Sequence, residues 1–80
     1  MKYLIIPTAW NRDVFSFKIE FYLNSRLVGG GLILAKKKEP NSFKVVWERV
    51  KTTDTLDGEL KKFVDYNRIW ADCLEMIQII

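Results

Sequence analysis

The clearest pattern in the chain is a strict alternation of apolar and polar side chains over residues 13–24. Every second position is apolar, in the order Phe15, Phe17, Ile19, Phe21 and Leu23. Because successive side chains of a strand point to opposite faces, this period predicts a β-strand with one buried face and one wet face. Asn24 and Ser25 follow it, and both residue types favour turns, so we expect a tight hairpin into the next strand.

The second strand of that hairpin is expected over residues 27–36, and it contains three consecutive glycines, 29–31. Glycines leave no side chain to pack, so they predict a bulge, a sharp bend or the close approach of another backbone. They do not form a phosphate-binding loop, because neither glycine fingerprint spacing is present and more strand-like sequence follows.

Two further strands are expected on either side of this hairpin. Residues 1–7 run from loose alternation into an apolar stretch, and Pro7 should end that strand because proline has no N–H to donate. Residues 43–51 alternate again, with Phe43, Val45 and Trp47 predicted to share one face. The pattern therefore predicts an antiparallel meander of three or four strands.

The period changes after residue 54, and the remainder is predicted to be helical. Asp54 is the expected N-cap, with Asp57 in the first turn, where the helix dipole favours acids. Apolar residues then recur at roughly helical spacing, at Leu56, Leu60, Phe63, Val64, Trp70, Leu74 and Ile77. Asn67 interrupts this stripe, so the helix over about 55–78 is either continuous or broken near residues 66–68.

These elements predict a small α+β fold in which the meander carries the C-terminal helix, or two helices, on one face. The 80 residues are enough for one domain, 1–80, and 49% of them are hydrophobic, which permits a dense core. The apolar runs are too short to cross a membrane, and no secretory signal is visible. A single cysteine, Cys73, cannot form an internal disulfide, so a reducing, cytoplasmic location is expected.

Conventional catalytic chemistry is poorly represented. The chain has no histidine, which excludes Ser-His and Cys-His arrangements and the commonest metal ligand. With one cysteine, a structural zinc site of the usual kind is also excluded. Cys73 lies near the apolar stripe and is interpreted as an inert core residue. The acids Glu48 and Asp54 match no metal-nuclease spacing, so we expect neither enzyme activity nor a cofactor.

Charge is distributed unevenly along the chain. Residues 1–53 carry ten basic and four acidic groups, a net charge of +6, whereas residues 54–80 carry three basic and six acidic groups, a net charge of −3. The strongest local feature is the run Lys36, Lys37 and Lys38, with Lys44 and Lys51 nearby. These lysines are candidate phosphate ligands for a nucleic acid, and the alternative is a solvated turn that discourages edge pairing.

The acidic C-terminal segment, residues 54–80, offers a different surface. Asp65, Asp72 and Glu75 are candidates for docking on a basic partner protein, and the alternative is an ordinary solvated helix face. Trp10 and Tyr22 are candidate aromatic anchors, since tryptophan and tyrosine are common at the centres of interfaces.

We therefore expect a non-enzymatic binding protein that acts by occupying a larger protein or protein–nucleic-acid target. In size and style the chain is similar to inhibitors encoded by phages and other mobile elements, including anti-CRISPR proteins. This similarity is one of type and covers no motif, and immunity or antitoxin-type partners belong to the same class. The alternative is a nucleic-acid-binding regulator that uses the basic sheet and the lysine turn. A homodimer through an edge strand or through Ile79 and Ile80 is a further alternative.

Overall fold

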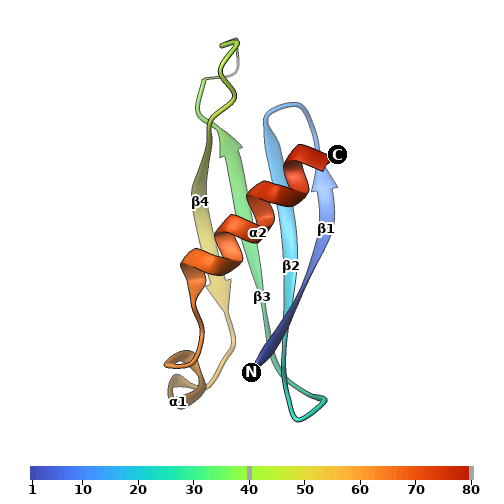
Figure 1. Cartoon of the computed structure of the whole chain (residues 1–80), viewed down its shortest axis with the longest axis vertical. Coiled ribbons are helices and arrows are strands. Elements are labelled where there is room, and N and C mark those ends of the chain that lie inside the picture. Colours follow the sequence, from blue (N-terminus) through green and yellow to red (C-terminus); the bar gives the residue numbers. More distant parts are fainter. Residues whose placement is uncertain (40, 80) are drawn as a thin grey trace.

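The alternating segment forms β2, Val14–Leu23, an inner strand of a four-stranded antiparallel sheet in the computed structural model, which describes residues 1–39 and 41–79 (Figure 1). The strand order is β1-β2-β3-β4, so each strand pairs with its neighbour in sequence. The other elements are β1 Lys2–Trp10, β3 Arg26–Lys37, β4 Trp47–Asp54, α1 Gly58–Lys61 and α2 Tyr66–Ile79. The predicted α+β meander is confirmed.

The core lies between α2 and one face of the sheet, and α2 runs diagonally across that face (Figure 1). The alternating apolar residues of β2 are its centre, since Phe17, Ile19 and Phe21 are almost completely buried. From α2, Ile69 and Cys73 reach the same core. These two residues are four apart and so share one face of the helix. Among the residues whose burial the structure describes, the buried ones are Phe15, Phe17, Ile19, Phe21, Ile33, Ala35, Leu56, Ile69 and Cys73.

The β2–β3 hairpin closes through Asn24 and Ser25, as the sequence predicts. Both residues have positive φ, 51° and 64°, and they lie between the paired residues Leu23 and Arg26. Two successive left-handed residues are typical of a type I′ turn, whose twist matches that of the flanking strands. Asparagine tolerates this conformation, whereas serine is strained in it.

Replacing Ser25 by glycine is expected to stabilise the protein. Glycine adopts φ near 64° without the steric cost that a Cβ atom imposes, and Asn-Gly is the preferred type I′ pair. We expect the free energy of unfolding to rise by about 0.5–1 kcal/mol. This is the steric cost of serine in the left-handed conformation, minus the cost of the additional conformational entropy that glycine gives to the unfolded chain. Urea denaturation followed by tryptophan fluorescence measures this. An unchanged or lower midpoint would contradict the turn assignment.

The prediction that Pro7 ends the first strand is wrong. β1 continues through Pro7 to Trp10. This is possible because β1 is an edge strand, in which the position of the N–H that proline lacks can face away from β2. The register shifts between Pro7 and Ala9, which makes Thr8 the extra residue of a bulge. The Thr8 hydroxyl lies 3.1 Å from the carbonyl oxygen of Ser16 and donates to it.

The prediction for the last strand is wrong at both ends. β4 begins at Trp47 instead of 43, and it continues to Asp54 instead of ending at 51. Phe43 is fully exposed and Val45 more than half exposed, because the connection between β3 and β4 extends past the end of α2 (Figure 1). Asp54 therefore belongs to a strand and does not cap a helix.

The C-terminal segment is broken into two helices, and the break lies at residues 62–65, before the predicted position. Asp57 is the N-cap of α1, and its side chain accepts a hydrogen bond from the Glu59 amide at 3.0 Å. Asp65 accepts hydrogen bonds from the amides of Asn67 and Arg68, both at 3.1 Å, and so starts α2. Phe63, predicted on the apolar stripe, falls in the break and is exposed.

The glycine run allows the close backbone approach that the sequence predicts. Gly31 lies opposite Asp54 of β4, and a Cβ atom at Gly31 would overlap the carbonyl oxygen of Thr53. A register shift between Phe21 and Tyr22 also places a bulge in β3 immediately before this run, with Val28 as the extra residue. Both features follow from the absence of side chains at 29–31.

Candidate binding surface

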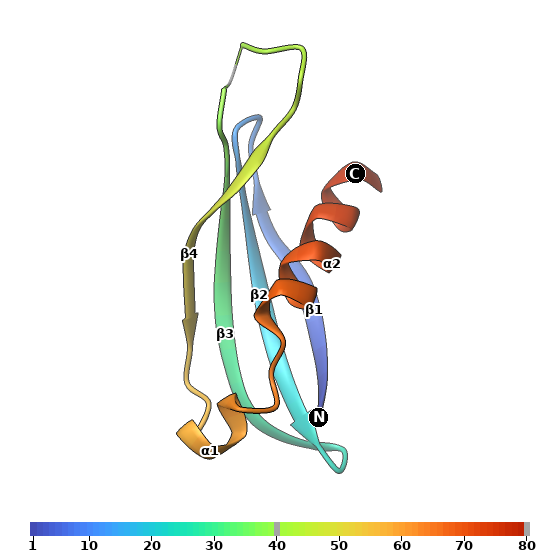
Figure 2. The same cartoon turned by 60° about the vertical axis from the view of Figure 1, so that its left-hand side comes forward.

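No described element covers the sheet face opposite the helices (Figure 2). Because paired residues of neighbouring strands share a face, the strand register defines its members. The central row is Ile6, Lys18, Leu32 and Thr53. We call this uncovered side of the sheet the outer face, and its residues are Lys2, Leu4, Ile6, Ala9, Val14, Ser16, Lys18, Glu20, Tyr22, Leu27, Gly30, Leu32, Leu34, Lys36, Glu48, Lys51 and Thr53.

Large apolar side chains are exposed on the outer face. Leu4 is 50% and Leu32 52% exposed, and Leu27 is more exposed still. Each of them comes from a different row of the sheet. Half-buried Ile6 lies in the row of Leu32, and half-buried Leu34 lies in the next row beyond it. Single exposed apolar residues are common on proteins, whereas several on one flat face indicate a binding surface.

Basic groups outnumber acidic groups on this face. Its four lysines are Lys2, Lys18, Lys36 and Lys51, and its two acids are Glu20 and Glu48. One acid, Glu48, lies directly opposite Lys36 and compensates it. The outer face therefore combines exposed leucines with a net positive charge.

The lysines predicted as a nucleic-acid-binding set do not lie together. Lys36 and Lys51 are on the outer face, but Lys37 is on the helix side, opposite Trp47. Lys38 and Lys44 belong to the exposed connection between β3 and β4. Consecutive residues of a strand point to opposite faces, which is why the run of three is divided. Sequence reasoning missed Lys2 and Lys18, although Lys18 occupies a polar position of the alternating segment.

The predicted protein-binding residues are also dispersed, and two of the three acids have structural roles. Asp65 caps α2, and Asp72 accepts a hydrogen bond from the Tyr3 hydroxyl and pairs with Arg68 at 3.5 Å. The hydrogen bond to Asp72 is the main reason that the pKa of Tyr3 is raised. Glu75 is exposed on α2. Among the described residues, α2 therefore presents less free negative charge than its composition indicates.

The two predicted aromatic anchors lie on opposite faces. Tyr22 is half-buried on the outer face, opposite Lys2 and Leu27. Trp10 is on the helix side at the end of β1, where its ring stacks on Phe15 with a centroid distance of 5.5 Å. Trp47 meets Phe15 edge-on from the other side, also at 5.5 Å. A cleft of about 350 Å³ lies at this aromatic cluster.

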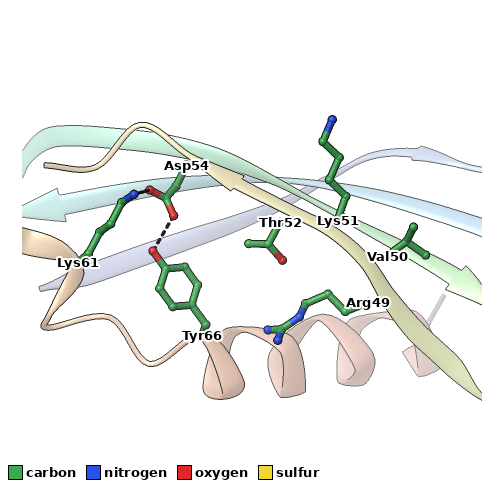
Figure 3. A pocket seen from close by; sticks show the side chains of 7 residues that line it. All are labelled: Arg49, Val50, Lys51, Thr52, Asp54, Lys61 and Tyr66. Atoms are coloured by element: carbon green, nitrogen blue, oxygen red, sulfur yellow. Dashed lines mark hydrogen bonds and ion pairs between the residues drawn. The ribbon is translucent and has the colours of Figure 1, made fainter. Parts of the chain in front are cut away.

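A second hollow, of about 520 Å³, lies beside β4 on the helix side (Figure 3). Its wall contains a polar cluster in which the Tyr66 hydroxyl donates to Asp54 at 2.6 Å and the Lys61 ammonium lies 3.2 Å from the other carboxylate oxygen. Partial burial acts to raise the pKa of Asp54, but Tyr66 and Lys61 outweigh it and the pKa lies below 3.8. Burial and the bond to Asp54 raise the pKa of Tyr66 to about 12.

Stability is expected to fall at high pH because of this bond. The pKa of Tyr66 is raised from 10.0 to about 12, so its contribution is fully present below pH 10 and is lost as the pH rises through 12. The Asp54 contribution is present above pH 3.8 and is lost as the pH falls through its lowered pKa. Urea denaturation from pH 9 to pH 12 measures the first effect. In the control Tyr66→Phe the loss of stability above pH 10 should be smaller, because the raised pKa values of Tyr3 and Cys73 still contribute to it, and an identical profile in both proteins would contradict the prediction.

The described residues contain no group of three or more acidic or cysteine side chains arranged to hold a metal ion. Cys73 is completely buried, as predicted, and burial together with the charge of Asp72 raises the pKa of its thiol to about 11. Within residues 1–39 and 41–79, neither helix has the length and hydrophobicity that crossing a bilayer requires.

No protein-family model matches the chain, and no curated protein sequence or solved structure shows significant similarity to it. Function is therefore argued from the surfaces described above.

Proposed function

We propose that this protein is a non-enzymatic binding protein that docks its outer face on an acidic surface of a larger protein. The observation that carries the proposal is the presence of half-exposed leucines on a sheet face that no described element covers. Burying Leu4 and Leu32 against a partner removes apolar area from water at about 25 cal/mol per Å². That gain is available only when another molecule covers the face.

The lysines of the outer face support an acidic partner. Lys18 lies between Ile6 and Leu32, so its aliphatic stem can lie along the apolar surface while the ammonium group reaches a carboxylate. Complementary charge of this kind mainly increases the association rate and the specificity of a complex. Occupation of a larger target is the mode of action of small cytoplasmic inhibitors, including those of phages, and of immunity and antitoxin-type proteins.

Photo-crosslinking tests the proposal directly. A photoreactive amino acid is placed at position 32 on the outer face, and a control is placed at Ala71, which is exposed on α2. In nuclease-treated lysate of the organism that carries the gene, position 32 should crosslink to a protein and position 71 should not. An excess of protein without the photoreactive amino acid should suppress the crosslink. The same excess of the Lys18→Glu, Leu32→Glu variant should not suppress it. Equal crosslinking from both positions would contradict the proposal.

The second candidate, nucleic-acid binding, is supported by the same excess of lysines. The outer face offers only one aromatic ring, Tyr22, whereas single-stranded nucleic acids are usually bound by several stacking rings. Titration with short labelled DNA and RNA at low salt separates the two functions. Binding that weakens steeply with salt and is lost in Lys18→Glu would favour the nucleic acid. No polarisation change at low salt would exclude it as the direct ligand.

A further inference from the structure

The two edges of the sheet are not equally protected against pairing with another strand. β1 contains Pro7, which has no N–H, and the bulge at Thr8, and both features hinder strand addition. β4 also has a bulge, at Val50, but it contains no proline, and alternate residues of an edge strand turn their N–H and C=O groups away from the sheet. No described backbone hydrogen bond joins residues 47–53 to any segment other than β3. β4 is therefore the open edge.

The space beside β4 is large enough for the side chains of an added strand. The hollow of about 520 Å³ follows four consecutive residues of β4, 49–52, and is bounded by Asp54, Lys61 and Tyr66 (Figure 3). α2 starts beside the C-terminal end of β4 and crosses toward β1 (Figures 1 and 2), and Trp47 packs on Phe15 at the other end, whereas residues 48–51 between them are exposed. Both faces of the edge are accessible.

The uncompensated charge along this edge is positive. Arg49 faces the helix side and Lys51 the outer side, because the bulge at position 50 shifts the register between them. Neither forms an ion pair with any described residue. Of the acids of β4, Asp54 is held by Tyr66 and Lys61, whereas Glu48 lies opposite Lys36 without an ion pair, so residues 48–51 carry two basic groups and one acid.

One polar atom in the same hollow also lacks a partner. The Thr52 hydroxyl oxygen is buried and has no hydrogen-bond partner among the described residues. A buried hydroxyl without a partner costs about 1–3 kcal/mol, so this part of the wall is not optimised for the isolated chain.

We infer that β4 accepts an extended acidic segment of a partner protein as a fifth strand of the sheet. Backbone hydrogen bonds supply the pairing, and carboxylates on the two faces of the segment meet Arg49 and Lys51. A second copy of β4 fits less well, because a two-fold register centred on Arg49 or on Lys51 places like charges opposite each other. The inference shares with the proposed function only the premise that the partner is a protein.

Titration of the isotope-labelled protein with a capped heptapeptide that has glutamate at two adjacent central positions, which point to opposite faces of a strand, and valine or threonine elsewhere tests this inference. Amide shifts in the nuclear magnetic resonance spectrum should change along residues 47–54. The same peptide with lysine in place of glutamate should bind at least about tenfold more weakly, because like charges then face Arg49 and Lys51. Methylation of alternate peptide nitrogens should abolish binding. Shift changes centred on the outer face, equal affinity for both peptides, or no shifts at millimolar peptide would overturn the inference.

Charge-reversed variants localise the effect. Arg49→Glu with Lys51→Glu should weaken the acidic peptide by at least about tenfold, since two favourable cross-strand pairs become repulsive. The matched control Lys38→Glu with Lys44→Glu makes the same charge change in the β3–β4 connection and should keep the affinity within about twofold, at equal thermal stability. Equal losses in the two variants would contradict the inference. Lys18→Glu with Leu32→Glu should still bind the peptide, so failure at the edge is distinguishable from failure at the outer face.

Discussion

Replacing Phe17 by alanine is expected to lower the free energy of unfolding by about 3–5 kcal/mol, the usual cost of emptying a buried phenylalanine site. Phe17 has 0% exposed surface and lies at the centre of the core. It pairs with Ile33 of β3, on the face of the sheet that α2 covers. A domain of 80 residues has roughly 4–12 kcal/mol of stability in total, at about 0.05–0.15 kcal/mol per residue. The variant should therefore be marginally folded or unfolded at room temperature.

Urea denaturation followed by far-ultraviolet circular dichroism measures this loss. Phe43→Ala is the matched control, because Phe43 has the same side chain but is fully exposed on the connection between β3 and β4. Its free energy of unfolding should change by no more than about 0.5 kcal/mol. Comparable losses in the two variants would show that the connection packs on the core, contrary to the structure.

Replacing Gly31 by alanine is expected to cost about 2–3 kcal/mol, at the upper end of the range for overpacking. The added Cβ would overlap the carbonyl oxygen of Thr53 and would lie 3.2 Å from the Cβ of Asp54. Both neighbours belong to the paired strand β4, so relief requires a shift of the ladder between β3 and β4. The same shift would disturb the bond between Asp54 and Tyr66.

Gly58→Ala is the control for this substitution. Gly58 starts α1, and no atom lies within 4 Å of a Cβ built on it. Alanine there should raise the free energy of unfolding by about 0.4–1 kcal/mol, because it reduces the entropy of the unfolded chain. Opposite signs at the two positions are thus expected in thermal or urea unfolding. A neutral Gly31→Ala would contradict the close approach of the two strands.

The sequence by itself determined the central hairpin and the buried face of its first strand. The period of two over residues 13–24 predicted that Phe15, Phe17, Ile19 and Phe21 are buried, because local backbone geometry alone sends alternate side chains to opposite faces. Asn24 and Ser25 predicted the turn for an equally local reason. The close approach at the glycines and the burial of Cys73 followed in the same way.

The tertiary structure decided the features that depend on neighbours distant in sequence. β1 passes through Pro7 because it is an edge strand, and Phe43 is exposed because α2 ends before reaching it. Asp65 caps α2 and Asp72 accepts a hydrogen bond from Tyr3, so two candidate docking residues also have structural roles. Neither effect is encoded in a local period.

The candidate surfaces were likewise decided by tertiary structure. Residues Lys18, Lys36 and Lys51 are 15 or more positions apart in the chain, and only the strand register places them on one face. The open edge of β4 exists because β4 is the last strand of the sheet and α2 crosses toward β1. A hydrophobic pattern states which side of one strand is buried, whereas the packing of the helix decides which face and which edge of the sheet are left for a partner.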